Sequence, residues 1–165
     1  MSMIGNYRRI SPDDLSELIA NPDSIMDIFD EDETTGYPAD VCLDIDKTWK
    51  AIHFLLTGEM GEGEPPLSYA VLGGKLLGDI DVGYGPARYI TPAQVKEVAK
   101  ALQAIPRDML LSRFNLKRFR DEGIYPTILE GGPEDMDYIG SYYEKLVSFM
   151  VRAGQAGDAM LLYLN

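Results

Sequence analysis

Cysteine and histidine, the side chains that most often act as a nucleophile and its base, each occur once, as Cys42 and His53. Any nucleophile–base pair built on a histidine must therefore use His53. Cys42 stands between Val41 and Leu43, and a free cysteine in an apolar run is usually a buried structural residue. His53 fits a histidine at a helix border whose ring bonds to a neighbour. We therefore expect no catalytic residue, and the sequence favours a protein that is not an enzyme.

Metal and cofactor sites are not expected from the residues present either. One cysteine and one histidine cannot make a Cys₄ or Cys₂His₂ zinc site. The acidic run beginning at Asp30 places Thr35 and Val41 where an EF-hand loop needs glycine and glutamate. Gly73-Gly74-Lys75 is followed by leucine instead of the serine or threonine of a phosphate-binding loop. The sequence predicts no metal and no cofactor, with unspecific association of Ca²⁺ or Mg²⁺ as the alternative.

The strongest candidate for a ligand site is the run of residues 84–89, in which tyrosines flank glycine, proline and arginine. Its arginine, Arg88, can form two parallel hydrogen bonds to a carboxylate. If Arg88 is buried it needs an acid, which we expect to be Asp44, Asp46 or Asp81. The run then either clamps a loop internally or helps to line a pocket for a small anion or polar metabolite. The ligand-binding candidates are Trp49, His53, Tyr84, Arg88, Tyr89, Asp44 and Asp46.

The spacing of apolar residues and the capping residues predict the helices that position these side chains. Residues 46–57 have apolar side chains at helical spacing, with Trp49 on the apolar face and His53 at its border. Ser11 before proline, and Thr91 with a glutamine three residues later, predict two further helix starts. The last long helix is expected to begin at Pro133 and end at Gly154.

Several segments are expected to be extended or irregular. Residues 3–10 and 159–164 are candidate strands. Four consecutive acids and the turn residues after them predict a polar loop over residues 30–38, and residues 78–86 read as a glycine-rich loop. Residues 67–77 are apolar but interrupted by two glycines, so helix and strand both stay open for them. These elements predict a helix-rich α+β fold, one domain over residues 1–165, with a small sheet that pairs the N- and C-terminal strands.

Charge narrows the range of partners. The chain has 27 acids and 15 bases, a net charge of −12, which repels nucleic-acid phosphates and anionic lipid. We therefore expect no nucleic acid and no membrane, and instead a basic protein partner or a small polar ligand. Five bases lie between Arg107 and Arg120, and we expect them to pair with the protein's own acids. No apolar stretch of about 18 residues or N-terminal signal region is present, so a cytoplasmic protein is expected.

Four stretches carry a resemblance to a known family: residues 1–8 (MSMIGNYR), 43–58 (LDIDKTWKAIHFLLTG), 70–74 (AVLGG) and 83–89 (GYGPARY). The sequence resembles the YfbM-like proteins, a bacterial domain of unknown function. The resemblance implies an α+β fold and a bacterial cytosolic protein of about this length. It implies no activity, and no catalytic residue is carried over from it.

Two functional hypotheses follow. The first is a non-catalytic interaction module or an immunity-like module that binds a basic partner, an analogy drawn from small size and acidity alone. The alternative is a small-molecule binding protein or enzyme, for an anion or polar metabolite, with its site near His53 and Arg88. The sequence favours the first hypothesis because it lacks a complete catalytic motif.

Overall fold

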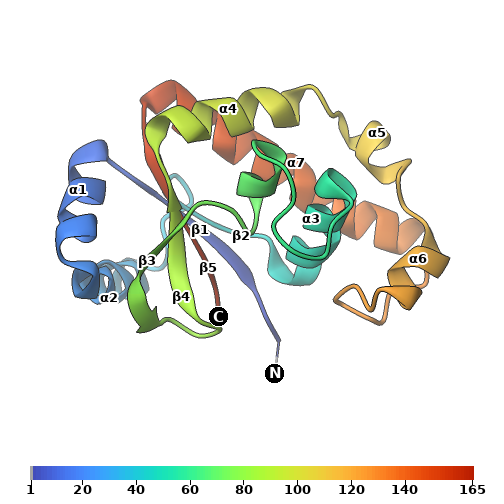
Figure 1. Ribbon diagram of the computed structural model, residues 1–165, viewed down its shortest axis with the longest axis horizontal. Helices are drawn as coiled ribbons and strands as arrows, with labels where there is room; N and C mark the ends of the chain where they lie inside the picture. Colours follow the sequence, from blue (N-terminus) through green and yellow to red (C-terminus); the bar gives the residue numbers. More distant parts are fainter. Residues whose placement is uncertain (1) are drawn as a thin grey trace.

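The computed structural model describes residues 2–165, and over these residues it has seven α-helices and five strands (Figure 1). The strands are β1 (Gly5–Ile10), β2 (Cys42–Asp44), β3 (Lys75–Asp81), β4 (Pro86–Ile90) and β5 (Ala159–Leu164). The α-helices are α1 (Pro12–Ala20), α2 (Ile25–Thr35), α3 (Trp49–Thr57), α4 (Pro92–Gln103), α5 (Arg107–Leu111), α6 (Leu116–Asp121) and α7 (Pro133–Ala156). Three short 3₁₀ turns are η1 (Pro22–Ser24), η2 (Asp46–Thr48) and η3 (Leu67–Ala70).

The five strands form one sheet in the order β2-β1-β5-β4-β3, and every neighbouring pair is antiparallel. The N-terminal and C-terminal strands are adjacent at its centre, where Tyr7 of β1 lies opposite Leu162 of β5. Leu162 is in turn opposite Arg88 of β4. The α+β fold and the pairing of the two terminal strands are therefore confirmed.

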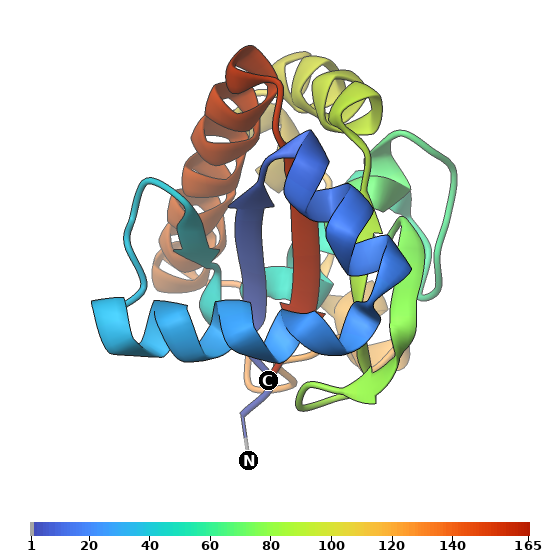
Figure 2. The ribbon, with the colours of Figure 1, turned by 90° about the vertical axis from the view of Figure 1, so that its left-hand side faces the viewer.

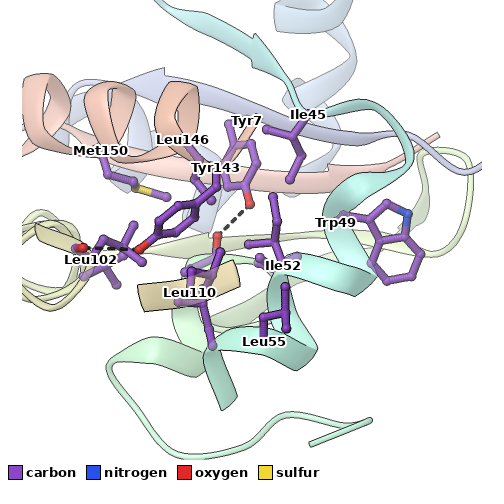
Figure 3. Packing of buried hydrophobic residues seen from close by; sticks show 14 of the residues in the cluster. Tyr7, Ile45, Trp49, Ile52, Leu55, Leu102, Leu110, Tyr143, Leu146 and Met150 are labelled. Carbon is purple, nitrogen blue, oxygen red and sulfur yellow. Dashed lines mark hydrogen bonds between the residues drawn. The ribbon is translucent and has the colours of Figure 1, made fainter. Parts of the chain in front are cut away.

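Helices cover both faces of the sheet. One face packs on α3, α4 and α7 in the larger core, which includes Tyr7, Ile52 and Leu146 (Figure 3). The other face carries a smaller core that includes Ile10 and Leu161, and helices α1 and α2 cross in front of the sheet on this side (Figure 2). Successive side chains of a strand point to opposite faces. Both cores therefore share one sheet, which makes a single domain.

The capping residues begin the helices as expected. The Ser11 hydroxyl accepts a hydrogen bond from the amide of Asp14, and Thr91 and Gln94 form a reciprocal capping box at α4. The predicted end of α7 at Gly154 is wrong, because the helix continues to Ala156 and a left-handed Gly157 ends it. Gly154 packs against α4, where a built Cβ would lie 3.7 Å from Lys96. The glycine therefore serves helix packing, and the stop comes three residues later.

The loop predicted over residues 30–38 is also wrong in part. Helix α2 continues through the four acids to Thr35 and ends at a left-handed Gly36. Asp32 points inward from this stretch and pairs with Arg8 of β1. This ion pair and the packing of α2 on the sheet outweigh the repulsion among the exposed acids.

The secondary structure of residues 67–81 also differs from the prediction. Residues 67–77, left open between helix and strand, contain both: η3 and then the start of β3. Residues 78–81, expected to belong to a glycine-rich loop, are part of β3 because that strand pairs with β4. Across residues 2–165, no helix combines the length and apolar character needed to cross a membrane.

Candidate functional site

Tyr84 and Arg88 line one cavity, of about 70 Å³, on the sheet face that carries the larger core. Its floor comes from the three central strands, where Tyr7, Leu162 and Arg88 form a row of cross-strand neighbours. Val71 and Leu72, which follow η3, also line the cavity. The hydroxyl of Tyr7 donates to the carbonyl of Ala70 at 2.6 Å and so fixes η3 against the sheet (Figure 3).

Arg88 has no close carboxylate partner in the part of the chain that the structure describes. Its Nη1 donates to the carbonyl of Gly74 at 3.3 Å and lies 3.8 Å from the carboxylate of Glu62. The Glu62 side chain is 76% exposed. Arg88 is only half-buried, so the condition for an internal acid partner is not met, and it pairs with none of Asp44, Asp46 and Asp81.

Each of those three aspartates orders a local turn or contacts a helix. Asp44 accepts from the amide of Asp46, and Asp46 accepts from the hydroxyl of Tyr138 on α7. Asp81 accepts from the amides of Gly83 and Gly85, and these bonds lower the pKa of its carboxyl. The glycine-rich run before Arg88 is therefore an aspartate-ordered hairpin turn between β3 and β4.

Trp49 and His53 lie on α3 and do not line the cavity. The indole of Trp49 donates to the carbonyl of Met3, and its ring packs against Tyr125. His53 is fully buried instead of lying at a helix border, and its Nε2 donates to the carbonyl of Gly61. Nδ1 of the same ring is buried with no partner among the described residues. Burial lowers the pKa of His53, and the charge of Lys50 lowers it further against the opposing effect of the Gly61 bond.

His53 belongs to a set of side chains that hold the acidic segment 58–66 on α3. Lys50 donates to the carbonyl of Met60, one residue before the His53 contact. Thr57 bonds to Glu59 at the start of the segment. These contacts give Lys50, His53 and Thr57 a structural role and place Glu62 near Arg88.

The remaining candidates lie apart from the cavity. Tyr89 follows Arg88 in the strand, so its side chain packs in the smaller core on the opposite sheet face. Asp44 lines a separate groove of about 450 Å³, with Tyr37, Cys42 and Tyr163. The structure thus brings together Tyr84 and Arg88 and separates them from the other five candidates. Sequence reasoning missed Tyr7, Leu72 and Glu62, whose proximity to Arg88 depends on strand register and a long connection.

A second feature is the distribution of charge, which is concentrated in one layer. We define the acidic layer as residues 12–35, which form α1, η1 and α2. It contains nine acids and no base, and therefore carries −9 of the net −12, while the rest of the chain has 18 acids against 15 bases. All of its acids except Asp32 are exposed: Asp13, Asp14, Glu17, Asp23, Asp27, Asp30, Glu31 and Glu33.

The basic segment from Arg107 to Arg120 bonds largely within the protein. Arg107 pairs with Asp137 at 2.9 Å and with Glu144 at 3.4 Å on α7. Arg113 donates to the carbonyl of Leu55, and Arg118 to that of Gly58, at the C-terminal end of α3. Cations are favoured there because backbone carbonyls and the helix dipole are negative at that end. Lys117 pairs with Asp121 at 2.5 Å. Pairing with the protein's own acids is therefore confirmed for Arg107 and Lys117, whereas Arg113 and Arg118 bond to backbone carbonyls.

The described residues contain no group of three or more His, Cys, Asp and Glu side chains arranged to hold a metal ion. Cys42 is half-buried, and desolvation together with the nearby Asp32 charge raises the pKa of its thiol to about 12. A thiol with so high a pKa is largely protonated at neutral pH and is a weak nucleophile.

Comparison with known families gives a match to the model described as "Domain of unknown function (DUF1877)" over residues 1–163. The chain belongs to this family. It is 30% identical to Protein YfbM of Escherichia coli (strain K12) over 132 residues, which cover 78% of this chain and 75% of YfbM. The crystal structure of YfbM, described as a protein of unknown function, superposes with a TM-score of 0.73 at 28% identity, covering 98% of this chain and 99% of that chain.

Two of the stretches that carry the resemblance to the YfbM-like proteins have structural explanations here. Gly74 has a φ of +87°, and a Cβ there would lie 2.1 Å from the carbonyl oxygen of Tyr89. A Cβ at Gly73 would lie 2.1 Å from the Cα of Tyr69. The paired glycines therefore allow the chain to pass from η3 into β3 in contact with β4. The second stretch, residues 83–89, forms the hairpin turn and strand that present Tyr84 and Arg88.

Proposed function

We propose that this protein is a non-catalytic interaction module whose acidic layer binds a basic protein partner. The observation that carries the proposal is the concentration of charge: residues 12–35 hold −9 of the net −12 on one side of the sheet (Figure 2). A single-sign surface of this kind attracts a partner of opposite charge and accelerates association. This role is the one expected of an immunity-like protein that covers a basic target.

The placement of acids in α2 supports a role beyond folding. Asp27 and Glu31 are four residues apart, and Asp30 lies three residues from both Asp27 and Glu33. Like charges at these spacings destabilise a helix by about 0.2–0.5 kcal/mol per pair. Glu33 also lies in the last turn, where the helix dipole disfavours negative charge. The structure has no basic residue in that turn. Helix stability alone therefore does not account for these acids.

Apolar side chains within the acidic layer supply the second component of a protein interface. Ile19 of α1 is 49% exposed and Met26 of α2 is 43% exposed. Apolar residues, methionine in particular, contribute to interface cores, whereas charges around them guide approach and orientation. A partner with a basic rim and a small apolar centre fits this surface.

A pull-down from the lysate of the native host tests the proposal. Three proteins are immobilised, namely the wild type, a layer variant and a control variant, and the proteins that each one retains are identified. The layer variant carries Asp27→Asn, Asp30→Asn and Glu33→Gln. The control variant has the same change in net charge at exposed acids outside the layer: Glu59→Gln, Glu64→Gln and Glu97→Gln.

We expect a basic protein that the wild type and the control variant retain and the layer variant loses. Calorimetry with the purified partner should then give an affinity that falls steeply between 50 and 300 mM NaCl, because screening shortens the range of these charges. A partner bound equally by the layer variant, or the absence of any partner that distinguishes the two variants, contradicts the proposal.

A further inference from the structure

The cavity beside Arg88 combines a basic side chain with an apolar lining. Arg88 is its one charged lining residue, and about half of the other lining residues are aliphatic. The aliphatic members are Val71, Leu72, Pro86, Leu162 and Leu164. The adjacent groove of about 450 Å³ has no basic side chain among its lining residues and carries Asp44. Of these two neighbouring hollows, only the cavity beside Arg88 is lined by a basic side chain.

The guanidinium of Arg88 has unused hydrogen-bonding capacity. Within residues 2–165 only Nη1 makes a hydrogen bond, to the carbonyl of Gly74. A separation of 3.8 Å from Glu62 is too long for a hydrogen bond. The Arg88 side chain is only 31% exposed, so water reaches it incompletely. Nε and Nη2 are therefore available to a ligand.

Glu62 is placed so that the carboxylate of a ligand could replace it beside Arg88. Its carboxylate is the acid nearest to Arg88, yet its side chain is mostly exposed and makes no hydrogen bond among the described residues. The chain next to it is held independently, because His53 and Lys50 fix the carbonyls of Gly61 and Met60. The Glu62 side chain can therefore turn away into water without unfolding the segment that carries it.

We propose that this cavity binds a small aliphatic monocarboxylate, whose carboxylate replaces Glu62 on Arg88 while its alkyl group lies on Leu72 and Leu162. The planar guanidinium matches a carboxylate with two parallel hydrogen bonds. A volume of about 70 Å³ corresponds to roughly two water molecules at ~30 Å³ each, so only a short chain fits. The apolar wall disfavours phosphate, whose remaining charged oxygens would be buried without partners. This inference is independent of the acidic layer.

The test is a titration of the ¹⁵N-labelled full-length protein with sodium propionate, followed by amide chemical shifts. We expect saturable shifts at Tyr7, Arg88 and Leu162 with a Kd on the order of 1 mM, as befits a ligand of so few atoms. Propionamide has the same shape without the charge, and sodium chloride supplies equal ionic strength. Neither should move these resonances in a saturable way.

Variants identify the anchoring group. Arg88→Gln should abolish the response, whereas Lys75→Gln, an equal charge change at an exposed position on the neighbouring strand, should retain it. Glu62→Gln should bind propionate about threefold more tightly, because it removes the competing carboxylate of a largely exposed ion pair. This gain would not arise if Arg88 were purely structural, and the variant tests the proposal even if Arg88→Gln fails to fold.

Three results would overturn the inference. The first is the absence of saturable shifts with propionate in the wild-type protein. The second is an equal affinity in the wild type and Glu62→Gln. The third is saturable binding of inorganic phosphate at these residues in preference to propionate, which would show a general anion site instead of a monocarboxylate site.

Discussion

Arg8 of β1 and Asp32 of α2 form an ion pair beneath the acidic layer, with Nε of Arg8 2.9 Å from Oδ2 and 3.1 Å from Oδ1 of Asp32. Asp32 is 1% exposed, and it is the acid of the layer that faces the sheet. This contact joins the most negatively charged helix to the central strands. Asp32 therefore has a structural role, whereas the other eight acids of the layer are exposed to solvent.

Replacing Asp32 by asparagine should destabilise the protein. The change leaves the partly buried guanidinium of Arg8 without its carboxylate, which costs about 2 kcal/mol for a hydrogen bond to a charged group. Urea denaturation of Asp32→Asn measures this loss. Asp30→Asn is the matched control in the same helix, and its free energy of unfolding should not fall. Equal stability of Asp32→Asn and the wild type would show that the pair does not hold α2.

Reversing one exposed charge in the layer should stabilise the protein while weakening partner binding. Asp30→Lys turns two like-charge contacts in α2, with Asp27 and Glu33, into attractive ones, and we expect a gain of about 1 kcal/mol. Glu97→Lys makes the same change in net charge but opposes Lys100 three residues later, so it should lose a few tenths of a kcal/mol. Thermal and urea unfolding compare the two variants. A loss of stability in Asp30→Lys would refute the idea that the acids are kept at the expense of folding.

The single histidine should make the protein less stable as the pH falls from 7.5 toward 5.5. Burial holds the pKa of His53 below its ordinary value of 6.5 in the folded state. Below pH 6.5 the unfolded chain therefore binds a proton that the folded protein does not, and stability falls until the pH reaches the lowered folded pKa. The proton NMR titration of the His53 ring should give a midpoint below 6.5. A midpoint at or above 6.5 would be inconsistent with a buried neutral ring.

The control for this pH effect is His53→Gln. Histidine is the side chain whose ordinary pKa lies between pH 5 and 8, so this variant should lose most of the change in unfolding free energy between pH 7.5 and 5.5. If the free energy of unfolding depends on pH in the same way in His53→Gln and the wild type, the effect comes from carboxylates.

The thiol of Cys42 should react slowly with iodoacetamide at pH 8. Its pKa of about 12 leaves little thiolate at that pH. The rate should keep rising up to pH 10 without a plateau. Asp32→Asn should raise the rate, because removing that charge lowers the pKa of the thiol. A plateau centred near pH 8.5 would indicate an ordinary exposed cysteine.

Much of the fold could be predicted because local signals agreed with tertiary packing. Ser11 and Thr91 cap helices through contacts only three residues long. The apolar spacing of residues 46–57 predicts the helix α3, although α3 is buried on more than its apolar face. The acidic stretch Asp30–Glu33 was mispredicted because its local repulsion favours a loop. The contact that decides its structure, between Arg8 and Asp32, spans 24 residues.

The candidate site could be predicted only in part for the same reason. Tyr84 and Arg88 belong to one hairpin, so their proximity follows from local sequence. Tyr7 reaches Arg88 through the register of β1, β5 and β4, and Glu62 reaches it through the folding of segment 58–66 on α3. Neither relation can be deduced from spacing along the chain. Helical periodicity places His53 at a border, because it does not reveal that segment 58–66 packs on that side of α3.

Amide hydrogen exchange of the protein alone and in complex with its captured partner shows directly whether the acidic layer is the binding surface. Slowed exchange on binding should be concentrated in residues 12–35, with little change in the basic segment, residues 107–121. Protection confined to residues 107–121, or to the hairpin that carries Arg88, with the acidic layer unchanged, would contradict the proposed role of this layer.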